Sequence, residues 1–170
     1  MHTLFERDNR GAGVDDPTGA KAVATKRIYR IDIAGATDVR RISLAGTNAL
    51  PAGVRPVVKT LFIDVLAELR AAGSVIPEKM EGLAFGPRLM DGAYELLAAT
   101  DNDFSVTQND SGAQFHVCTN GTRSAQVAID SGCPAGLSLL PTYLMSFKTG
   151  SNQIELPPRP PLPKDNPFKH

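Results

Sequence analysis

The sequence predicts an all-β fold with one short helix, and two observations lead to this prediction. Short segments rich in β-branched and aromatic residues recur along the chain, and links containing Gly, Asn, Asp or Pro separate them. Short strands at such intervals are typical of a sandwich, a barrel or a propeller. The chain has 170 residues, which is enough for one ordinary domain with its own core.

The first half of the chain predicts two strands joined by a long loop. Leu4 and Phe5 are interpreted as the end of a strand that enters a charged turn at residues 6–11. Residues 11–25 are rich in Gly, Asp, Ala and Pro and predict a loop. Residues 26–33 alternate as a half-buried strand does. One face of this strand is predicted to carry Tyr29, Ile31 and Ile33.

The middle of the chain predicts a strand followed by the single helix. Residues 57–63 are β-branched and aromatic, which favours a strand after a second loop. Asp64 then offers a side-chain oxygen that caps a helix, and Gly73 is suited to ending it. We expect this helix to bury Leu66 and Leu69.

A hairpin and a series of short strands complete the predicted fold. Residues 80–85 and 94–100 are separated by Asp91-Gly92, a strong turn signal, so we expect them to pair. Three further strands are predicted at residues 114–118, 126–129 and 142–147.

The end of the sequence predicts a separate tail. Residues 156–163 are dominated by proline, which cannot donate backbone hydrogen bonds to a sheet. We therefore divide the chain into a folded part, residues 1–148, and a Pro-rich disordered tail, residues 149–170. A spacer is a more common role for such a tail than peptide recognition.

The charge balance argues against two classes of partner. Lys plus Arg and Asp plus Glu each number 18, so the net charge is zero. No broad basic surface for nucleic acid or an anionic membrane is expected. No segment approaches the roughly 20 apolar residues that span a bilayer, and residues 1–8 lack the apolar region of a signal peptide.

An acidic cluster is the strongest candidate for chemistry. If the hairpin strands pair antiparallel, the start of the first lies beside the end of the second, which brings Glu81 towards Asp101. Asn102 and Asp103 follow directly. Calcium prefers such oxygen ligands, whereas zinc fits poorly because His116 is the only histidine inside the predicted fold. The alternative is an Asx turn at residues 101–103 beside an exposed Glu81.

Other candidate residues leave alternatives open. Arg7 and Arg10 lie in the charged turn, where they could hold a phosphate or carboxylate or take part in an ion-pair network. No G-x-S-x-G signature surrounds Ser138 or any other serine. His116 is more typical of a structural histidine than of a base. The chain has two cysteines, Cys118 and Cys133. Their spacing alone is compatible with a disulfide or with two unpaired thiols.

Four blocks together resemble the phytase-like family, also called esterase-like phytases: residues 6–11, 26–32, 77–87 and 101–104. The resemblance runs from about residue 4 to about residue 148, and residues 133–144 are similar to the closing strand of that family. It implies an exported bacterial β-propeller, of which this chain would form a C-terminal part of two to three blades. A closed ring needs more chain, so we expect earlier blades and an export signal outside this sequence.

The resemblance also implies a periplasmic or extracellular hydrolase of phosphate or carboxylate esters. Calcium held by Glu81, Asp101, Asn102 and Asp103 would polarise the substrate. Arg7 or Arg10 would neutralise developing charge. Glu81-Gly82 is similar to the Glu-Gly placement in calcium-dependent lactonase-type propellers. Phytate is disfavoured as a substrate because no run supplies a dense Lys/Arg pocket. The alternatives are a noncatalytic calcium-stabilised binding module and an inactive fragment of a longer enzyme.

Overall fold

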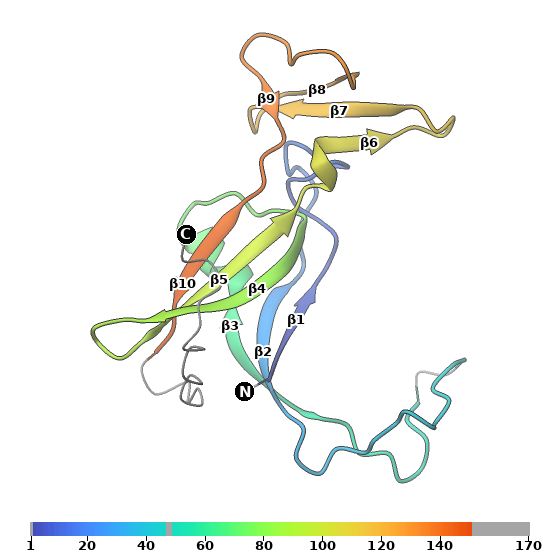
Figure 1. The fold of residues 1–170 in the computed structure, drawn as a ribbon, viewed down its shortest axis with the longest axis vertical. Helices are drawn as coiled ribbons and strands as arrows, with labels where there is room; N and C mark the ends of the chain where they lie inside the picture. Colours follow the sequence, from blue (N-terminus) through green and yellow to red (C-terminus); the bar gives the residue numbers. More distant parts are fainter. Residues whose placement is uncertain (1, 47–48, 151–170) are drawn as a thin grey trace, which may run out of the picture.

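The computed structural model describes residues 2–46 and 49–150 (Figure 1). Most of the predicted Pro-rich tail, residues 151–170, lies outside the described residues. Within the described part, the strands form three antiparallel sheets, and one α-helix accompanies them. The predicted all-β class with a single short helix is confirmed, and three small sheets fit a partial propeller of two to three blades.

The first two sheets pack against each other around a shared core, and the third lies beyond them (Figure 1). Sheet one has the order β1-β2-β3 and sheet two the order β10-β5-β4. In sheet three, β7 pairs with β6, β8 and β9. The strands are β1 His2–Arg7, β2 Lys26–Asp32, β3 Val58–Asp64, β4 Lys79–Arg88, β5 Tyr94–Asp101, β6 Val106–Gln108, β7 Gln114–Thr119, β8 Ser124–Ala128, β9 Ser138–Leu139 and β10 Leu144–Lys148.

Helix α1 spans Val65–Ala71 and is built as its sequence predicts. The Asp64 carboxylate accepts a hydrogen bond of 3.1 Å from the N–H of Ala67, which satisfies one unpaired donor of the first turn. Leu66 and Leu69 are buried. Gly73 has a φ of +61° just after the helix, a conformation that disfavours other residues.

The core lies between sheet one, helix α1 and sheet two. Its buried members are Ile28, Val65, Leu69, Met80, Leu96 and Ala98. The face predicted for β2 is not the face that enters this core, because Ile28 is fully buried whereas Ile33 is 52% exposed. The extra residue of the β-bulge opposite Ile28 and Tyr29 is Phe62 of β3, so β2 keeps its alternation and turns the face of Lys26 and Ile28 towards the core.

Sheet three is fastened by a disulfide between Cys118 on β7 and Cys133. This bond decides the alternative that the spacing of the two cysteines left open. Cys118 is fully buried, and Val14, Val117 and Leu140 form a second small core beside it. The predicted strands at residues 114–118 and 126–129 are confirmed as β7 and β8, while β6 and β9 were not predicted.

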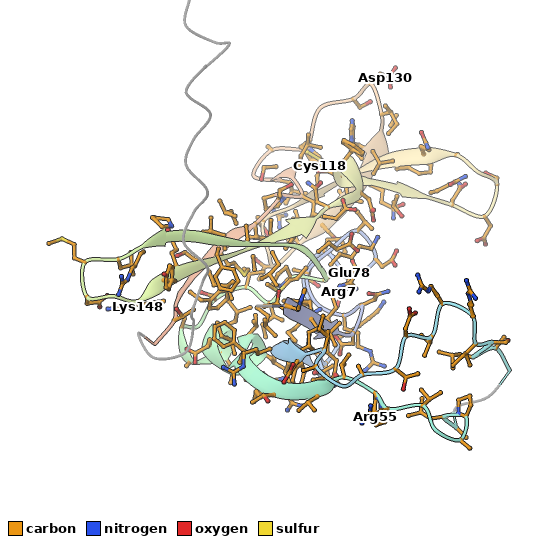
Figure 2. The ribbon with its side chains drawn as sticks, turned by 60° about the horizontal axis from the view of Figure 1, so that its bottom comes forward. Arg7, Arg55, Glu78, Cys118, Asp130 and Lys148 are labelled. Carbon is orange, nitrogen blue, oxygen red and sulfur yellow. A yellow bond between two sulfur atoms is a disulfide. The ribbon has the colours of Figure 1, made fainter. Side chains whose placement is uncertain are left out.

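Residues 33–46 and 49–57, between β2 and β3, form a long excursion away from the sheets (Figure 1). Figure 2 shows Arg55 on this excursion, well separated from Arg7 and Glu78. None of the described helices has the length and apolar character that crossing a membrane requires.

Candidate functional site

Strands β4 and β5 bring the predicted acidic residues to one end of sheet two. The register places Lys79 opposite Asp101 and Met80 opposite Thr100. The next pair joins Gly82 to Ala99, so Glu81 is the extra residue of a β-bulge. The prediction that the start of the first hairpin strand lies beside the end of the second is therefore confirmed.

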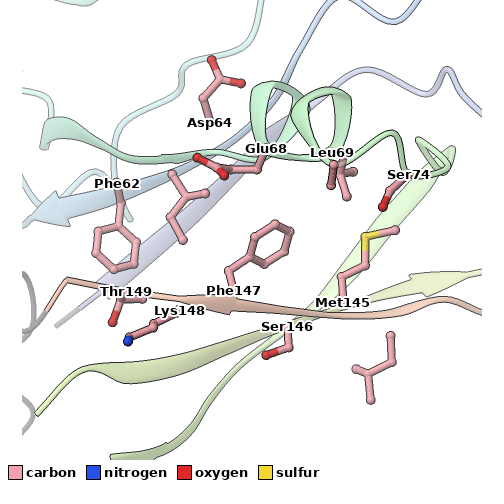
Figure 3. Close-up of a pocket in the computed structure, with 13 residues that line it drawn as sticks. Phe62, Asp64, Glu68, Leu69, Ser74, Met145, Ser146, Phe147, Lys148 and Thr149 are labelled. Atoms are coloured by element: carbon pink, nitrogen blue, oxygen red, sulfur yellow. The ribbon is translucent and has the colours of Figure 1, made fainter. Parts of the chain in front are cut away.

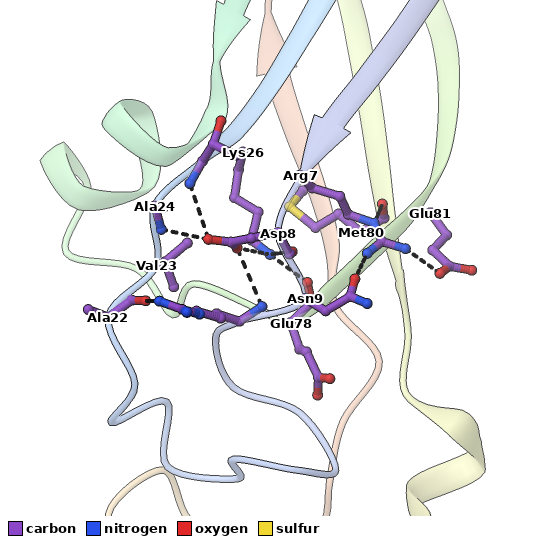
Figure 4. Close-up of polar contacts among 12 residues, drawn as sticks. Arg7, Asp8, Asn9, Ala22, Val23, Ala24, Lys26, Glu78, Met80 and Glu81 are labelled. Atoms are coloured by element: carbon purple, nitrogen blue, oxygen red, sulfur yellow. Dashed lines mark hydrogen bonds and ion pairs between the residues drawn. The ribbon is translucent and has the colours of Figure 1, made fainter. Parts of the chain in front are cut away.

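The bulge presents Glu81 to Arg7 of strand β1. The Arg7 guanidinium donates from Nη2 to Glu81 Oε1 at 2.5 Å and from Nε to the Met80 carbonyl at 3.0 Å. Its Nη1 donates to the side-chain oxygen of Asn9 (Figure 4). The sequence named Arg7 and Glu81 as separate candidates, and the fold joins them although 74 positions separate them.

In the turn after β5, the Asp103 carboxylate is paired with a lysine. The Lys79 ammonium forms an ion pair with Asp103, and this hydrogen bond raises the pKa of Lys79. Asp101 Oδ1 accepts a hydrogen bond of 2.9 Å from the N–H of Asp103, which is the Asx turn that the sequence offered as the alternative. Two of the predicted carboxylates, Glu81 and Asp103, thus each face a cation.

Asn102 and Arg10 contact other parts of the chain. Asn102 Nδ2 donates to the Leu140 carbonyl at 2.9 Å, and Arg10 Nη1 donates to the Ala22 carbonyl at 3.3 Å. Residues 2–46 and 49–150 contain no group of three or more His, Cys, Asp or Glu side chains spaced to hold a metal ion. The calcium site therefore stays a prediction.

The turn that carries Asp103 has an unusual backbone. Asp103, Phe104 and Ser105 all have positive φ, at 48°, 55° and 59°. The left-handed conformation costs about 1–2 kcal/mol for each residue with a Cβ. Ser105 is buried and donates to the Leu140 carbonyl at 2.7 Å, which helps to hold the turn. Strained backbone of this kind is concentrated at functional sites in proteins, so the turn supports Asp103 as a candidate functional residue.

Replacing Phe104 by glycine tests this strain. The Phe104 side chain is 92% exposed, so little buried contact is lost on its removal. We expect Phe104→Gly to be more stable than Phe104→Ala by about 1 kcal/mol, because only glycine relieves the Cβ penalty. Urea unfolding of both variants measures the difference. Equal stabilities of the two variants would contradict the strained turn.

A buried lysine next to this cluster was missed by sequence reasoning. Lys26 is fully buried and donates from Nζ to the carbonyls of Asp8 and Glu78, at 2.8 and 2.5 Å. Its ammonium also lies 3.4 Å from Asp8 Oδ1 (Figure 4). Burial lowers the pKa of Lys26, and Asp8 partly opposes that effect. The spacing gave no signal, because Lys26 shares its face of the alternating strand with Arg30 and Asp32.

The Asp8 carboxylate organises the long loop on the other side of Lys26. Burial by itself would raise the pKa of Asp8, but the N–H groups of Ala24 and Thr25 and the Lys26 ammonium together lower it. Asp8 Oδ2 accepts from Ala24 at 2.6 Å and from Thr25 at 3.3 Å. Around Asp8, the charged turn at residues 6–11 therefore forms the ion-pair network that the sequence offered as an alternative to a ligand site.

Glu78 is a second buried charge that the sequence did not reveal. Its exposed fraction is 4%, and Oε2 has no hydrogen-bond partner among the residues that the structure describes. A Cβ placed on Gly13 would lie 1.8 Å from Oε2, so the loop covers this carboxyl closely. Burial raises the pKa of Glu78, and the negative charge of Asp15 raises it further.

The raised pKa of Glu78 predicts a specific dependence of stability on pH. The folded state holds this proton more tightly than the unfolded chain, where a glutamate pKa is about 4.3. The resulting stabilisation is complete below that value and is lost as pH rises through the folded pKa. We expect the free energy of unfolding of the parent, relative to Glu78→Gln, to fall over this range in urea titrations. Parallel curves for the two proteins would contradict a raised pKa.

A cleft of about 730 Å³ lies between helix α1 and strand β10 (Figure 3). Phe62 and Phe147 give it an apolar wall, and Asp64 and Glu68 give it negative charge. None of the residues predicted as site residues lines it. Lys148 also lines the cleft and Asp64 is paired with Arg27, so the cleft has no single sign of charge, and the end of sheet two remains the candidate functional site because it holds the predicted residues.

A comparison with known families reports a match over more than half of the chain. The model of a phytase-like family, described as esterase-like activity of phytase, matches residues 3–104. The matched part runs from the second residue of strand β1 through β5 and ends inside the strained turn, so it includes Arg7, Glu81 and Asp103. The predicted closing strand at residues 133–144 lies outside the match and stays a prediction. Comparisons with curated proteins and with solved structures give no match.

Proposed function

Since the chain belongs to the phytase-like family, we propose that it is an exported hydrolase of phosphate or carboxylate esters that works with calcium. The observation that carries the proposal is the joining of Arg7 to Glu81 beside the Lys79–Asp103 pair, all within the part that the family match covers. Carboxylates and cations held close together suit ester hydrolysis, in which negative charge develops on the oxygens of the substrate.

The residues at the end of sheet two fit calcium by their chemistry. Glu81, Asp101 and Asp103 offer hard carboxylate oxygens, which calcium prefers. Because Glu81 and Asp103 are paired with Arg7 and Lys79, calcium would exchange places with these two cations. When bound, calcium supplies a positive centre that polarises an ester oxygen and lowers the pKa of water.

Arg7 is positioned to bind the oxygen on which negative charge develops. Its Nε is held by the Met80 carbonyl, so the guanidinium keeps its place if Nη2 leaves Glu81. A guanidinium offers two parallel N–H donors to a phosphoryl or acyl oxygen pair. Arg10 is the second candidate for this role, since a single carbonyl contact holds its side chain.

The disulfide supports the exported location. Disulfides form and persist mainly in the periplasm and outside the cell. The bond between Cys118 and Cys133 closes the polar segment between β7 and β9. We therefore propose a periplasmic or extracellular protein, with a small ester as its substrate.

A noncatalytic calcium-stabilised binding module is the second candidate. It is favoured by the ion pairs themselves, since Glu81 and Asp103 already have structural partners. In that case the cluster would stabilise sheet two and the acidic turn without turning over a substrate. An inactive fragment of a longer enzyme is a variant of the same alternative.

Turnover with and without calcium distinguishes these functions. Hydrolysis of p-nitrophenyl phosphate and p-nitrophenyl acetate is measured in added calcium and in a chelator, for the parent and for Glu81→Gln. The matched control is Glu68→Gln, an exposed glutamate on helix α1. Calcium-dependent turnover that falls at least 100-fold in Glu81→Gln at an unchanged melting temperature supports catalysis. A parent without turnover, together with a stability loss in Glu81→Gln, supports the binding module.

A further inference from the structure

A second pocket, of about 390 Å³, lies between the long loop and the end of helix α1. Loop residues 17–23 form one wall, and Arg70 and residues 74–76 form another. Thr119, Gly121 and Tyr143 close it from the side of sheet three. The pocket therefore exists only because three distant parts of the chain meet.

The charge of this pocket has one sign. Lys21 and Arg70 line it, and no Asp or Glu does. Most other cations of sheets one and two are paired with carboxylates, as Arg27 is with Asp64 and Lys59 with Glu6. Neither Lys21 nor Arg70 forms an ion pair within residues 2–46 and 49–150.

The two cations are held in place without being neutralised. Arg70 Nη2 donates to the Val23 carbonyl at 3.1 Å, which fixes the guanidinium against the loop. The main-chain N–H of Lys21 donates to Asp16 Oδ2 at 2.8 Å, while its ammonium has one long contact, 3.5 Å, to the Asp15 carbonyl. The remaining N–H groups of both side chains are available to a ligand.

Tyr143 adds a neutral donor. It is half-buried, and burial raises its pKa, so its hydroxyl keeps its proton at neutral pH. This hydroxyl makes no hydrogen bond within the described part of the chain. A pocket with two unpaired cations and a phenol, and without a carboxylate, has the donors that an oxyanion requires.

We propose that this pocket binds a phosphate group through Lys21, Arg70 and Tyr143. The two cations match the double negative charge of a phosphomonoester better than the single charge of a carboxylate. The pocket is larger than a phosphate ion, so an organic group attached to the phosphate also fits. The site is separate from the carboxylate cluster of sheet two and does not depend on the hydrolase proposal.

Calorimetric titration of the full chain with two probes tests the site. Inorganic phosphate represents the free ion, and phenylphosphonate represents a phosphoryl group on an organic carrier that hydrolysis cannot remove. We expect saturable binding of both at low ionic strength, tighter for phenylphosphonate, and weaker binding as salt rises. Equal or tighter binding of phosphate would overturn the inference of an organic carrier, and no saturable binding of either probe would overturn the site.

Variants assign the binding to these residues. We expect Lys21→Met and Arg70→Met each to weaken phenylphosphonate binding about tenfold or more, since each removes a charge-assisted hydrogen bond to the ligand. Tyr143→Phe removes only the hydroxyl and should weaken binding several-fold while the fold is kept. Arg55→Met, on the distant excursion, is the matched control and should bind as the parent does.

The outcomes separate this proposal from the proposed hydrolase. Unchanged affinity in Lys21→Met and Tyr143→Phe would overturn the phosphate site, whatever the ester turnover of the parent. Lost phosphonate binding in these variants supports the site even if the parent hydrolyses no ester, because the measurement needs no turnover.

Discussion

Replacing Gly11 by alanine is expected to destabilise the protein by about 3–5 kcal/mol. Gly11 has a φ of +121°, which residues with a Cβ strongly disfavour. An added Cβ would lie 2.5 Å from the Ile76 carbonyl oxygen and 2.7 Å from that of Pro77. These are backbone atoms, so no side-chain rotation relieves the contact.

Next to Gly11, the long loop forms hydrogen bonds with the residues that precede strand β4. Ala12 forms a parallel bridge with Pro77, with hydrogen bonds from Ala12 N to the Ile76 carbonyl and from Glu78 N to the Ala12 carbonyl, at 2.8 and 3.0 Å. Moving this bridge displaces the beginning of β4, which carries the candidate functional site. Gly11→Ala should therefore also lower any ester turnover.

Two other glycines serve as controls that distinguish the cost of a positive φ from the cost of a steric contact at the added Cβ. Gly53 has a φ of +80° and open space around it, so Gly53→Ala should cost about 1 kcal/mol from conformation alone. Gly132 has neither a positive φ nor a close neighbour, and its alanine variant should be nearly neutral. If Gly11→Ala cost no more than Gly53→Ala in urea unfolding, the close approach to residues 76–77 would be refuted.

Removing the buried ammonium of Lys26 is expected to have a comparable effect. Lys26→Ala leaves the Asp8 and Glu78 carbonyls without their donor and the Asp8 carboxylate without its cation. Breaking a buried ion pair by deleting one partner costs about 3–5 kcal/mol. Denaturant unfolding at neutral pH measures this loss.

The surface pair of Lys59 and Glu6 provides the matched control for Lys26. Both side chains are 39% exposed, so water screens their attraction. Lys59→Ala should cost less than about 1 kcal/mol by the same measurement. If both lysine variants lost a similar free energy of unfolding, burial would not strengthen the contribution of the Lys26 contacts to stability.

Much of the fold could be predicted because its signals are local. Asp64 and Gly73 mark the ends of helix α1 by their side-chain and backbone chemistry. Asp91-Gly92 fixes the hairpin of β4 and β5, and that pairing brings Glu81 towards Asp101. The face of β2 that enters the core was predicted wrongly, because periodicity shows which residues share a face but not which face the rest of the chain covers.

The candidate functional site was predicted only in part, for a related reason. Glu81 and Asp103 were recognised as acidic residues near one strand end, but their cationic partners Arg7 and Lys79 are chosen by strand packing. The burial of Glu78 depends on a loop that lies more than 60 positions earlier in the chain. Long-range contacts of this kind leave no mark in the spacing of residues.

The sequence by itself determined the all-β class, the capped helix, the β4–β5 hairpin and the family, because turn chemistry and motif order act over short distances along the chain. The tertiary structure alone decided which charges are buried and paired, since the removal of a lysine or glutamate from water depends on everything packed around it. It also decided the disulfide and the pocket lined by Lys21, Arg70 and Tyr143, which need atoms from separate parts of the chain to meet.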